Sequence, residues 1–379
     1  MAIPRLSRVY PLPVMSDPLP PPSLPFDLAQ PYGLSGAQKR ALLLDVLREL
    51  TQWHREGCEP YRHVLANLFP QADVANALDE VPYLPVRAFK TRDWVSVAPS
   101  TIIKTLTSSG TTGQAVSRVF LDRATSVRQT QVLAAIMGAF LGPDRLPMVI
   151  VDSADLLRDR TKFNARAAGI LGFSIFGRQH HYCLDTALEL ALPPLEEFLA
   201  ANAGKPILLF GFTFVVWQGL YRGAVKAGRT LDFGPGSILI HGGGWKKLND
   251  ERVSNEEFKT RLRERLGIAR VFNYYGMVEQ VGSIFMECEH GHLHSPVFAE
   301  VVVRDSLTLA PVPHGSPGVV QVLSALPLSY PGHSLLTEDM GVIHGEDDCP
   351  CGRPGRHFSI LGRIPAAELR GCSDTRAIP

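Results

Sequence analysis

The sequence predicts an α/β fold, in which a mostly parallel sheet is flanked by helices and followed by a small antiparallel β region. Two observations support this prediction. Between about residues 146 and 276, short β-rich runs alternate with helical patterns, which is the βαβ signature of a parallel sheet. From about residue 297, short strands are separated only by Pro/Gly turns, which is typical of antiparallel strands.

The N-terminal region is predicted to form an extended arm followed by two helices. Residues 11–31 are rich in proline, a composition that favours an extended chain. Ser35 and Gln38 then have the spacing of a helix capping box. Apolar residues follow at helical spacing: Leu43, Leu47 and Leu50. A second helix is expected near residues 59–68.

The βαβ region should contain four buried strands, at residues 148–152, 206–212, 237–242 and 269–276. Helical patterns lie between them, and the clearest cover residues 187–201 and 255–266. We expect four parts in the chain: an arm over residues 1–34, an α/β core over 35–296, a small β-rich subdomain over 297–365 and a tail over 366–379.

Composition excludes several functional classes. The 379 residues include 38 basic and 37 acidic side chains, so no basic excess favours a nucleic acid or an anionic membrane as partner. No apolar run reaches the roughly 20 residues of a membrane span, and the N-terminus lacks a secretory signal. We therefore expect a cytoplasmic protein, in which the six cysteines are ligands or nucleophiles before they are disulfides.

A hydroxyl-rich loop is the strongest local signal for chemistry. Six of the nine residues from Thr105 to position 113 are Ser or Thr, and two glycines allow a tight turn. Backbone N–H groups and hydroxyls gathered in one concavity would suit a polyphosphate, although the Lys of a Walker A loop is absent. The alternative is a polar surface loop. The candidate phosphate ligands are Ser108, Ser109, Gly110, Thr111, Thr112 and Gly113.

Two more segments follow predicted strands, at the sheet edge where open α/β folds bind ligands. Glycines at this edge would let a flat ring approach the backbone, and they are Gly242, Gly243 and Gly244. Tyr275 and Gly276 end the next strand, and Glu279 follows them with a carboxylate suited to Mg²⁺. The alternatives are an ordinary strand-to-helix turn and a solvated surface glutamate.

Cysteines and histidines make two further candidate sites. Cys288, His294, Cys349 and Cys351 form a plausible tetrahedral zinc set from two distant loops, with His290 and His292 as rival ligands. Free buried thiols are the alternative. Cys372 lies near the C-terminus beside Arg370, whose charge would favour the thiolate. An incidental tail cysteine is the alternative there.

The order of these motifs resembles that of the adenylate-forming superfamily of ligases. Along the chain the motifs follow in this order: a Ser-Ser-Gly-Thr-Thr-Gly loop, a Gly-Gly-Gly turn, Tyr-Gly-x-x-Glu, Thr-Glu-Asp339 and Gly-Arg363. Within the superfamily, the chain is similar to the acyl-protein synthetase family. That similarity covers roughly residues 30–375 and includes four stretches: His54-x-x-x-Cys58-x-x-Tyr61, residues 85–90, residues 117–122 and residues 369–372.

The resemblance implies the superfamily's large-domain fold and a set of roles. The hydroxyl loop would hold the phosphates of ATP, the triple glycine would border the adenine, and Tyr275–Gly276 would lie near the adenylate. Glu279 would ligate Mg²⁺. Asp339 would hydrogen-bond to the ribose hydroxyls, and Arg363 would contact the ribose or a phosphate. Cys372 would accept the acyl group as a thioester. Phenylacetate-CoA ligases of the same superfamily look similar at the cysteine and histidine loops, which supports Zn²⁺.

The implied reaction activates a carboxylic acid, by family expectation a fatty acid, and transfers the acyl group through Cys372 to a partner such as a fatty-acid reductase. Two alternatives remain: an acyl-CoA ligase and a non-catalytic adenylate-binding protein. Larger superfamily members carry a second domain with an assisting lysine after the Gly-Arg position. Because this sequence has no counterpart of that lysine, we expect another cation to offset the charge on phosphorus: Lys104, Arg118 or Lys246. Aromatic candidates for the acyl pocket are Phe210, Phe212, Phe214 and Trp217.

Overall fold

The computed structural model describes residues 20–72, 75–108, 116–158, 165–245 and 253–364. Its helices are α1 Gly36–Gly57, α2 Glu59–Leu68, α3 Ala88–Thr91, α4 Arg123–Leu141, α5 Asp155–Arg158, α6 Ala165–Ser174, α7 Leu192–Ala201, α8 Thr213–Val215, α9 Arg222–Lys226 and α10 Asn255–Leu266. A π-helical turn, Val216–Tyr221, joins α8 to α9, and 3-10 turns cover Leu78–Glu80, Pro99–Thr101 and Val278–Gln280.

The early strands are β1 Leu84–Pro85, β2 Ile102–Thr107, β3 Arg118–Asp122, β4 Leu146–Ser153, β5 Gly177–Leu184, β6 Leu208–Phe212, β7 Ile238–Gly242 and β8 Arg270–Tyr275. The later strands are β9 Phe285–Glu287, β10 Leu293–His294, β11 Ala299–Arg304, β12 Gly318–Ser324, β13 Ser334–Glu346 and β14 Arg356–Arg363.

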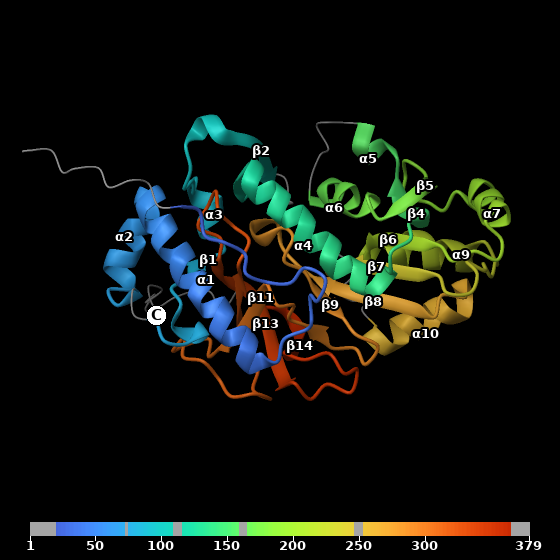
Figure 1. Ribbon diagram of the computed structural model, residues 1–379. Helices are drawn as coiled ribbons and strands as arrows, with labels where there is room; N and C mark the ends of the chain where they lie inside the picture. The colour runs from blue at the N-terminus through green and yellow to red at the C-terminus, as the bar shows by residue number, and fades with distance from the viewer. Residues whose placement is uncertain (1–19, 73–74, 109–115, 159–164, 246–252, 365–379) are drawn as a thin grey trace, which may run out of the picture.

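One large sheet organises the molecule, with strands in the order β11-β12-β13-β14-β10-β9-β8-β7-β6-β4-β5. Strands β5, β4, β6, β7 and β8 pair in parallel, as the βαβ pattern predicts. The later strands pair antiparallel, as expected, and β9 hydrogen-bonds to β8, so they continue the same sheet. Figure 1 shows α4 running across the middle, with α1 and α2 on one side and α7, α9 and α10 on the other.

Local signals place most elements where the sequence predicts them. The capping box is confirmed, because the Ser35 and Gln38 side chains each accept from the other's backbone N–H. The helix expected over residues 187–201 is wrong at its start, since α7 begins at Leu192. The Asp185 carboxylate accepts from the N–H groups of Ala187 and Glu189 and holds that stretch as a turn.

Three apolar clusters fill the core, and they lie on different faces of the sheet. Phe210 stacks on Phe173 at 4.2 Å in one cluster, whereas Trp217 stacks on Tyr221 at 4.5 Å in another. The four aromatic residues expected to line one acyl pocket are therefore divided between clusters. Phe210 and Trp217 are buried core residues, in line with their strong apolar character.

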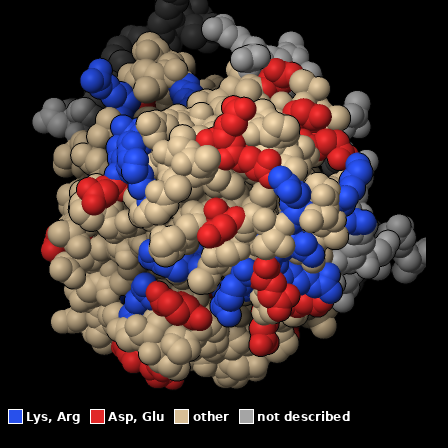
Figure 2. Space-filling view, turned by 90° about the vertical axis from the view of Figure 1, so that its right-hand side faces the viewer, with Lys and Arg blue, Asp and Glu red and all other residues tan. Residues whose placement is uncertain are grey.

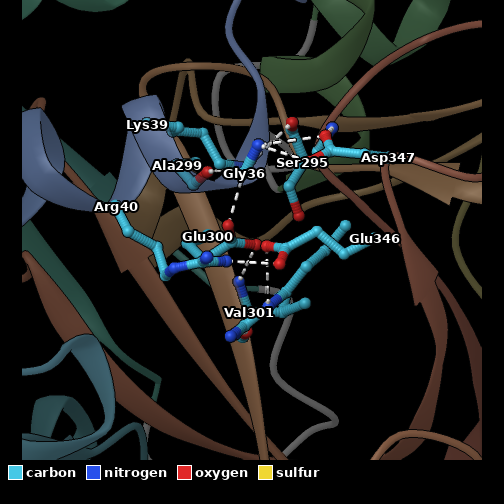
Figure 3. Close-up of polar contacts among 11 residues, drawn as sticks. Gly36, Lys39, Arg40, Ser295, Ala299, Glu300, Val301, Glu346 and Asp347 are labelled. Atoms are coloured by element: carbon cyan, nitrogen blue, oxygen red, sulfur yellow. Dashed lines mark hydrogen bonds and ion pairs between the residues drawn. The ribbon is translucent and has the colours of Figure 1, made fainter.

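Helix α1 is tied to the antiparallel side of the sheet by buried charges (Figure 3). Lys39 Nζ lies 2.7 Å from Glu300 Oε2, and both side chains are almost wholly inaccessible to solvent. Lys39 also donates to the Ser295 carbonyl at 3.3 Å, and the Gly36 N–H donates to Asp347 at 2.9 Å. Because each charge is paired, the helix can cover this sheet face without an uncompensated buried ion.

On the face that Figure 2 shows, basic and acidic side chains are interspersed. This distribution agrees with the nearly equal numbers of basic and acidic residues in the sequence. That face is the right-hand side of Figure 1, around α7, α9 and α10. Within the described part of the chain, every helix is too short or too polar to cross a membrane.

Candidate functional site

The candidate nucleotide site lies at the carboxyl ends of β7 and β8. These two strands are parallel neighbours, with Gly242 aligned to Tyr274. A Cβ atom at Gly242 would come within 2.5 Å of the Tyr274 ring, and Gly243 has a φ of +77°. Both positions therefore require glycine, and the backbone after β7 turns away at the edge where open α/β sheets place ligands.

Three predicted residues from three strands meet beside that edge. The Tyr275 hydroxyl, at the end of β8, donates to Asp339 Oδ2 at 2.7 Å. Asp339 in β13 aligns with Arg363 in β14, whose Nε lies 3.8 Å from Asp339 Oδ1. Burial, and then the Asp339 charge, raise the pKa of Tyr275 well above 10.0, so the phenol remains a hydrogen-bond donor. Arg363 is largely exposed and free to contact a ligand.

Glu279 occupies the 3-10 turn that follows β8 and is only 5% exposed. Burial raises the pKa of its carboxyl, while the Ser117 hydroxyl, Lys90 and Arg363 act in the opposite direction. No Lys or Arg of the described residues lies within ion-pair distance of this carboxylate. A buried carboxylate without a cationic partner is a suitable ligand for a divalent cation.

The hydroxyl loop connects the two strands of a hairpin, β2 and β3. At its base, Ser108 N–H donates to the Ser117 carbonyl at 3.1 Å, and Ser117 N–H donates to Ser108 Oγ at 2.9 Å. The other five candidate phosphate ligands, at positions 109–113, lie outside the described residues, as do Lys246 and Cys372.

Lys90 is a cation that the sequence analysis missed. It belongs to α3, within the family-like stretch 85–90, and its charge acts on Glu279. Among the expected cations, Arg118 pairs with Asp93 at 2.8 Å and Lys104 is exposed. The stretch that contains Lys90 stood out in the sequence, but only the fold brings its charge close enough to act on Glu279.

A second missed residue, Thr213, holds the glycine turn. Its hydroxyl donates to the Gly243 carbonyl at 2.8 Å, and His241 Nδ1 lies 3.0 Å from the same hydroxyl. Burial lowers the pKa of His241 to about 3, so its ring is neutral. The sequence offered no signal for this contact, because 28 positions separate Thr213 from His241.

The candidate metal centre forms where β10 and β14 pair. Cys288, His294, Cys349 and Cys351 each offer one ligand atom, and these atoms all lie within 4.8 Å of one another. The two sulfurs of Cys288 and Cys349 are 3.9 Å apart, and Cys351 Sγ is 3.3 Å from His294 Nε2. In a tetrahedral zinc site the corresponding separations are about 3.8 and about 3.5 Å. The donor set therefore fits zinc, with His294 in place of the rivals His290 and His292.

Both cysteine loops have a turn shaped for metal binding. The Gly291 N–H donates to the Cys288 carbonyl at 3.0 Å, and the Gly352 N–H donates to the Cys349 carbonyl at 3.0 Å. Both glycines have a φ close to +80°. The His290 N–H points at Cys288 Sγ at 3.4 Å, a contact that stabilises a thiolate.

Solved structures with this fold are adenylate-forming ligases. An open conformation of 2-hydroxyisobutyryl-CoA ligase in complex with 2-HIB-AMP and CoA matches with a TM-score of 0.67 and 19% identity, covering 88% of this chain and 77% of that one. The same ligase in the thioesterification state matches with a TM-score of 0.65 and 19% identity, covering 89% and 70%. The chain has the large-domain fold of this class of ligases.

The sequence profile of the acyl-protein synthetase, LuxE, family matches residues 24–377, and the chain belongs to that family of ligases. A long-chain-fatty-acid–luciferin-component ligase of Vibrio harveyi is 26% identical over 365 residues, which are 91% of this chain and 90% of the relative. Its counterpart from Aliivibrio fischeri is 24% identical over 371 residues, with the same coverage.

Proposed function

We propose that the protein activates a fatty acid with ATP to give an acyl-adenylate. The observation that carries the proposal is the cluster of Tyr275, Asp339 and Arg363 beside the glycine turn, because it combines hydrogen-bonding and cationic groups at a ligand-binding sheet edge. Asp339 would accept from the ribose hydroxyls, and Arg363 would contact the ribose or the α-phosphate. The names of the family and its relatives support a long-chain acid as substrate.

In the proposed first step, a carboxylate oxygen of the acid attacks the α-phosphorus of ATP and pyrophosphate leaves. Glu279 would hold Mg²⁺, which neutralises phosphate charge when bound. Among the described residues, the charges of Lys90 and Arg363 act to lower the pKa of Glu279, so we propose Lys90 in the position of the assisting lysine. The chain's contribution is positioning and electrostatic stabilisation of charge on phosphorus.

In the proposed second step, the thiolate of Cys372 attacks the acyl carbon and AMP leaves. The acyl group then passes from this thioester to an acceptor protein such as a fatty-acid reductase. Cys58 is the competing thiol, but it is buried and its pKa is raised by that burial, which disfavours the nucleophilic thiolate. The contrast makes Cys58→Ser a matched control for Cys372→Ser.

We further propose that zinc at the Cys288–His294–Cys349–Cys351 centre is structural. All four ligands come from the protein, which leaves no open position for a substrate. Zinc would fasten the loop before β10 to the loop before β14 and thereby support the strands that carry Asp339 and Arg363.

The proposed function is tested by acid-dependent ATP–pyrophosphate exchange over a panel of acids, from acetate to palmitate and including phenylacetate. We expect exchange with long-chain acids and without CoA. Radiolabelled acid should leave a hydroxylamine-labile label on wild type and on Cys58→Ser, but not on Cys372→Ser, while the latter still exchanges pyrophosphate.

Other outcomes contradict parts of this account. Label that is lost from Cys58→Ser and retained by Cys372→Ser would reassign the acceptor. Turnover that requires CoA, without labelled protein, would identify an acyl-CoA ligase. Absence of exchange with every acid, in protein that binds ATP, would identify a non-catalytic adenylate-binding protein.

A further inference from the structure

We propose that the chain holds a second zinc ion beside the first, bound by His292, His357 and Cys349, with the Cys349 thiolate bridging the two ions. The inference rests on the four-ligand zinc centre proposed above, but not on the acyl-transfer chemistry. Ligand atoms of these three residues all lie within 4.8 Å of one another. The two ligand sets share Cys349 alone, so they mark two neighbouring positions.

In the second set, the distance between two of the ligand atoms matches that in a zinc site. Cys349 Sγ lies 3.6 Å from His292 Nδ1. A sulfur and a nitrogen bound to one tetrahedral zinc are about 3.5 Å apart. The centroids of the His292 and His357 rings lie 4.8 Å apart.

His357 is oriented as a metal-binding histidine before any ion is added. Its Nε2 is 2.8 Å from Asp348 Oδ1, so the ring donates from that nitrogen to a carboxylate. Its Nδ1 is then the acceptor nitrogen, and it is buried with no hydrogen-bond partner in the part of the chain that the structure describes. Buried polar atoms are normally satisfied, and a carboxylate on the far nitrogen is the usual support of a zinc-bound histidine.

The backbone fixes this arrangement. His357 lies in β14 directly opposite His294 of β10, and His292 immediately precedes β10. The same strand pair that brings one histidine to the first centre therefore brings two others to the second. The strands hold them in place, which lowers the entropic cost of binding.

Electrostatics also favour a second cation here. One zinc ion with three thiolates and a neutral imidazole has a net negative charge. A second zinc beside Cys349 would offset that charge, and Asp348 lies behind His357. With three protein ligands, the second ion keeps one coordination position for water. His292 is only partly buried, so we expect this ion to exchange faster than the first.

His344 provides a matched control. Its ring lies 4.9 Å from that of His292, but its Nε2 is 2.8 Å from Ser359 Oγ, and it lies outside both ligand sets. Replacing it removes a histidine from the same surface without removing a proposed ligand.

The experiment is metal analysis of the full chain after dialysis against a small excess of zinc, followed by Co²⁺ titration monitored by visible absorption. Wild type and His344→Ala should bind about two zinc ions per chain, and His292→Ala and His357→Ala about one. Cobalt spectra should develop in two phases in wild type, and in a single phase in His292→Ala.

One zinc in wild type, unchanged in His292→Ala and His357→Ala, would overturn the second site and leave the first intact. Two ions in all of these variants would place the second ion elsewhere and also overturn it. Cys351→Ser tests the first centre separately, because it removes a ligand that the second site does not use. An unchanged zinc content and thermal stability in that variant would refute the first centre.

Discussion

The parallel part of the large sheet, here called the parallel side, and its antiparallel part, the antiparallel side, are stabilised by different kinds of contact. On the parallel side, β4 to β8 are packed between apolar clusters, as in the stack of Phe173 on Phe210. On the antiparallel side, β9 to β14 also carry buried polar clusters, among them the Lys39–Glu300 ion pair and the cysteine and histidine loops. The stability of the parallel side should depend on packing, and that of the antiparallel side on charge, protonation and metal.

The buried polar clusters differ in whether their polar atoms find partners within the protein itself. Lys39 and Glu300 satisfy one another, so that cluster needs no ligand. Near the cysteines, by contrast, His357 Nδ1 is buried and has no hydrogen-bond partner among the described residues. A buried polar atom without a partner is costly, and this cost is the physical reason to expect a ligand at one cluster and not at the other.

The largest expected effect comes from breaking the buried ion pair. Lys39→Met should destabilise the protein by about 3–5 kcal/mol, because Glu300 is left charged and buried. On the parallel side, Ile240→Val should cost only about 0.5–1.5 kcal/mol, through packing alone. Urea denaturation measures both, and Lys39→Met combined with Glu300→Leu should recover much of the loss. A Lys39→Met variant as stable as Ile240→Val would break the comparison.

The next effect concerns activity rather than stability. Asp339→Asn should lower kcat/KM for ATP by about tenfold to a hundredfold, since a hydrogen bond to a charged group contributes about 1.5–3 kcal/mol. Glu338→Gln is the matched control, because the neighbouring Glu338 pairs with exposed Arg87 at 2.7 Å instead. Equal kinetics for the two variants would remove Asp339 from the nucleotide site.

Acidification should weaken the antiparallel side through a stacked pair of buried histidines. The His54 and His333 rings are 5.0 Å apart, and burial lowers the pKa of His333 to about 3 and that of His54 well below 6.5. An unfolded histidine takes up a proton near pH 6.5 that the folded one refuses, so stability falls as the pH drops from 6.5 towards 3. The slope for each histidine should be on the order of 1 kcal/mol per pH unit.

His333→Gln tests this slope, because it removes one titrating ring and keeps a polar side chain. The variant should be less stable at pH 7.5 but should lose less stability than wild type between pH 6.5 and 5. Parallel curves for the two proteins, measured by urea denaturation at each pH, would mean that His333 titrates normally.

The smallest expected effect tests Thr213 as a positioning residue. Thr213→Val should raise KM for ATP about three- to tenfold with little change in kcat, since one neutral hydrogen bond contributes about 0.5–1.5 kcal/mol. Thr213→Ser keeps the hydroxyl and should restore KM. A fall in kcat at unchanged KM, or no rescue by serine, would contradict a role through the glycine turn.

Sequence patterns predicted this molecule best where local chemistry decides the structure. The capping box and the four parallel strands depend on neighbouring residues, and the structure contains each of them. Strand β5, which includes exposed polar residues such as Arg178 and His180, was missed because it lacks a continuous apolar run.

Long-range contacts were beyond the reach of the patterns. Gly and Asp motifs indicated the nucleotide site, but not that Tyr275 would donate to Asp339, 64 positions away. His292 and His294 have the same local context, and only the register of β10 against β14 separates their roles. The roles of positions 109–113 and of Cys372 stay predictions from the sequence.

The central claim is that a carboxylate attacks the α-phosphorus of ATP at the edge formed by Gly242, Tyr275 and Asp339. Its most direct test is to supply a fatty acid labelled with ¹⁸O in the carboxylate, together with ATP, and to recover AMP after hydroxylamine has cleaved the acyl product. Attack on the α-phosphorus leaves one carboxylate oxygen on phosphorus, so mass spectrometry should show one ¹⁸O in AMP from wild type. Unlabelled AMP, or ADP and labelled phosphate in its place, would contradict acyl-adenylate chemistry at this site.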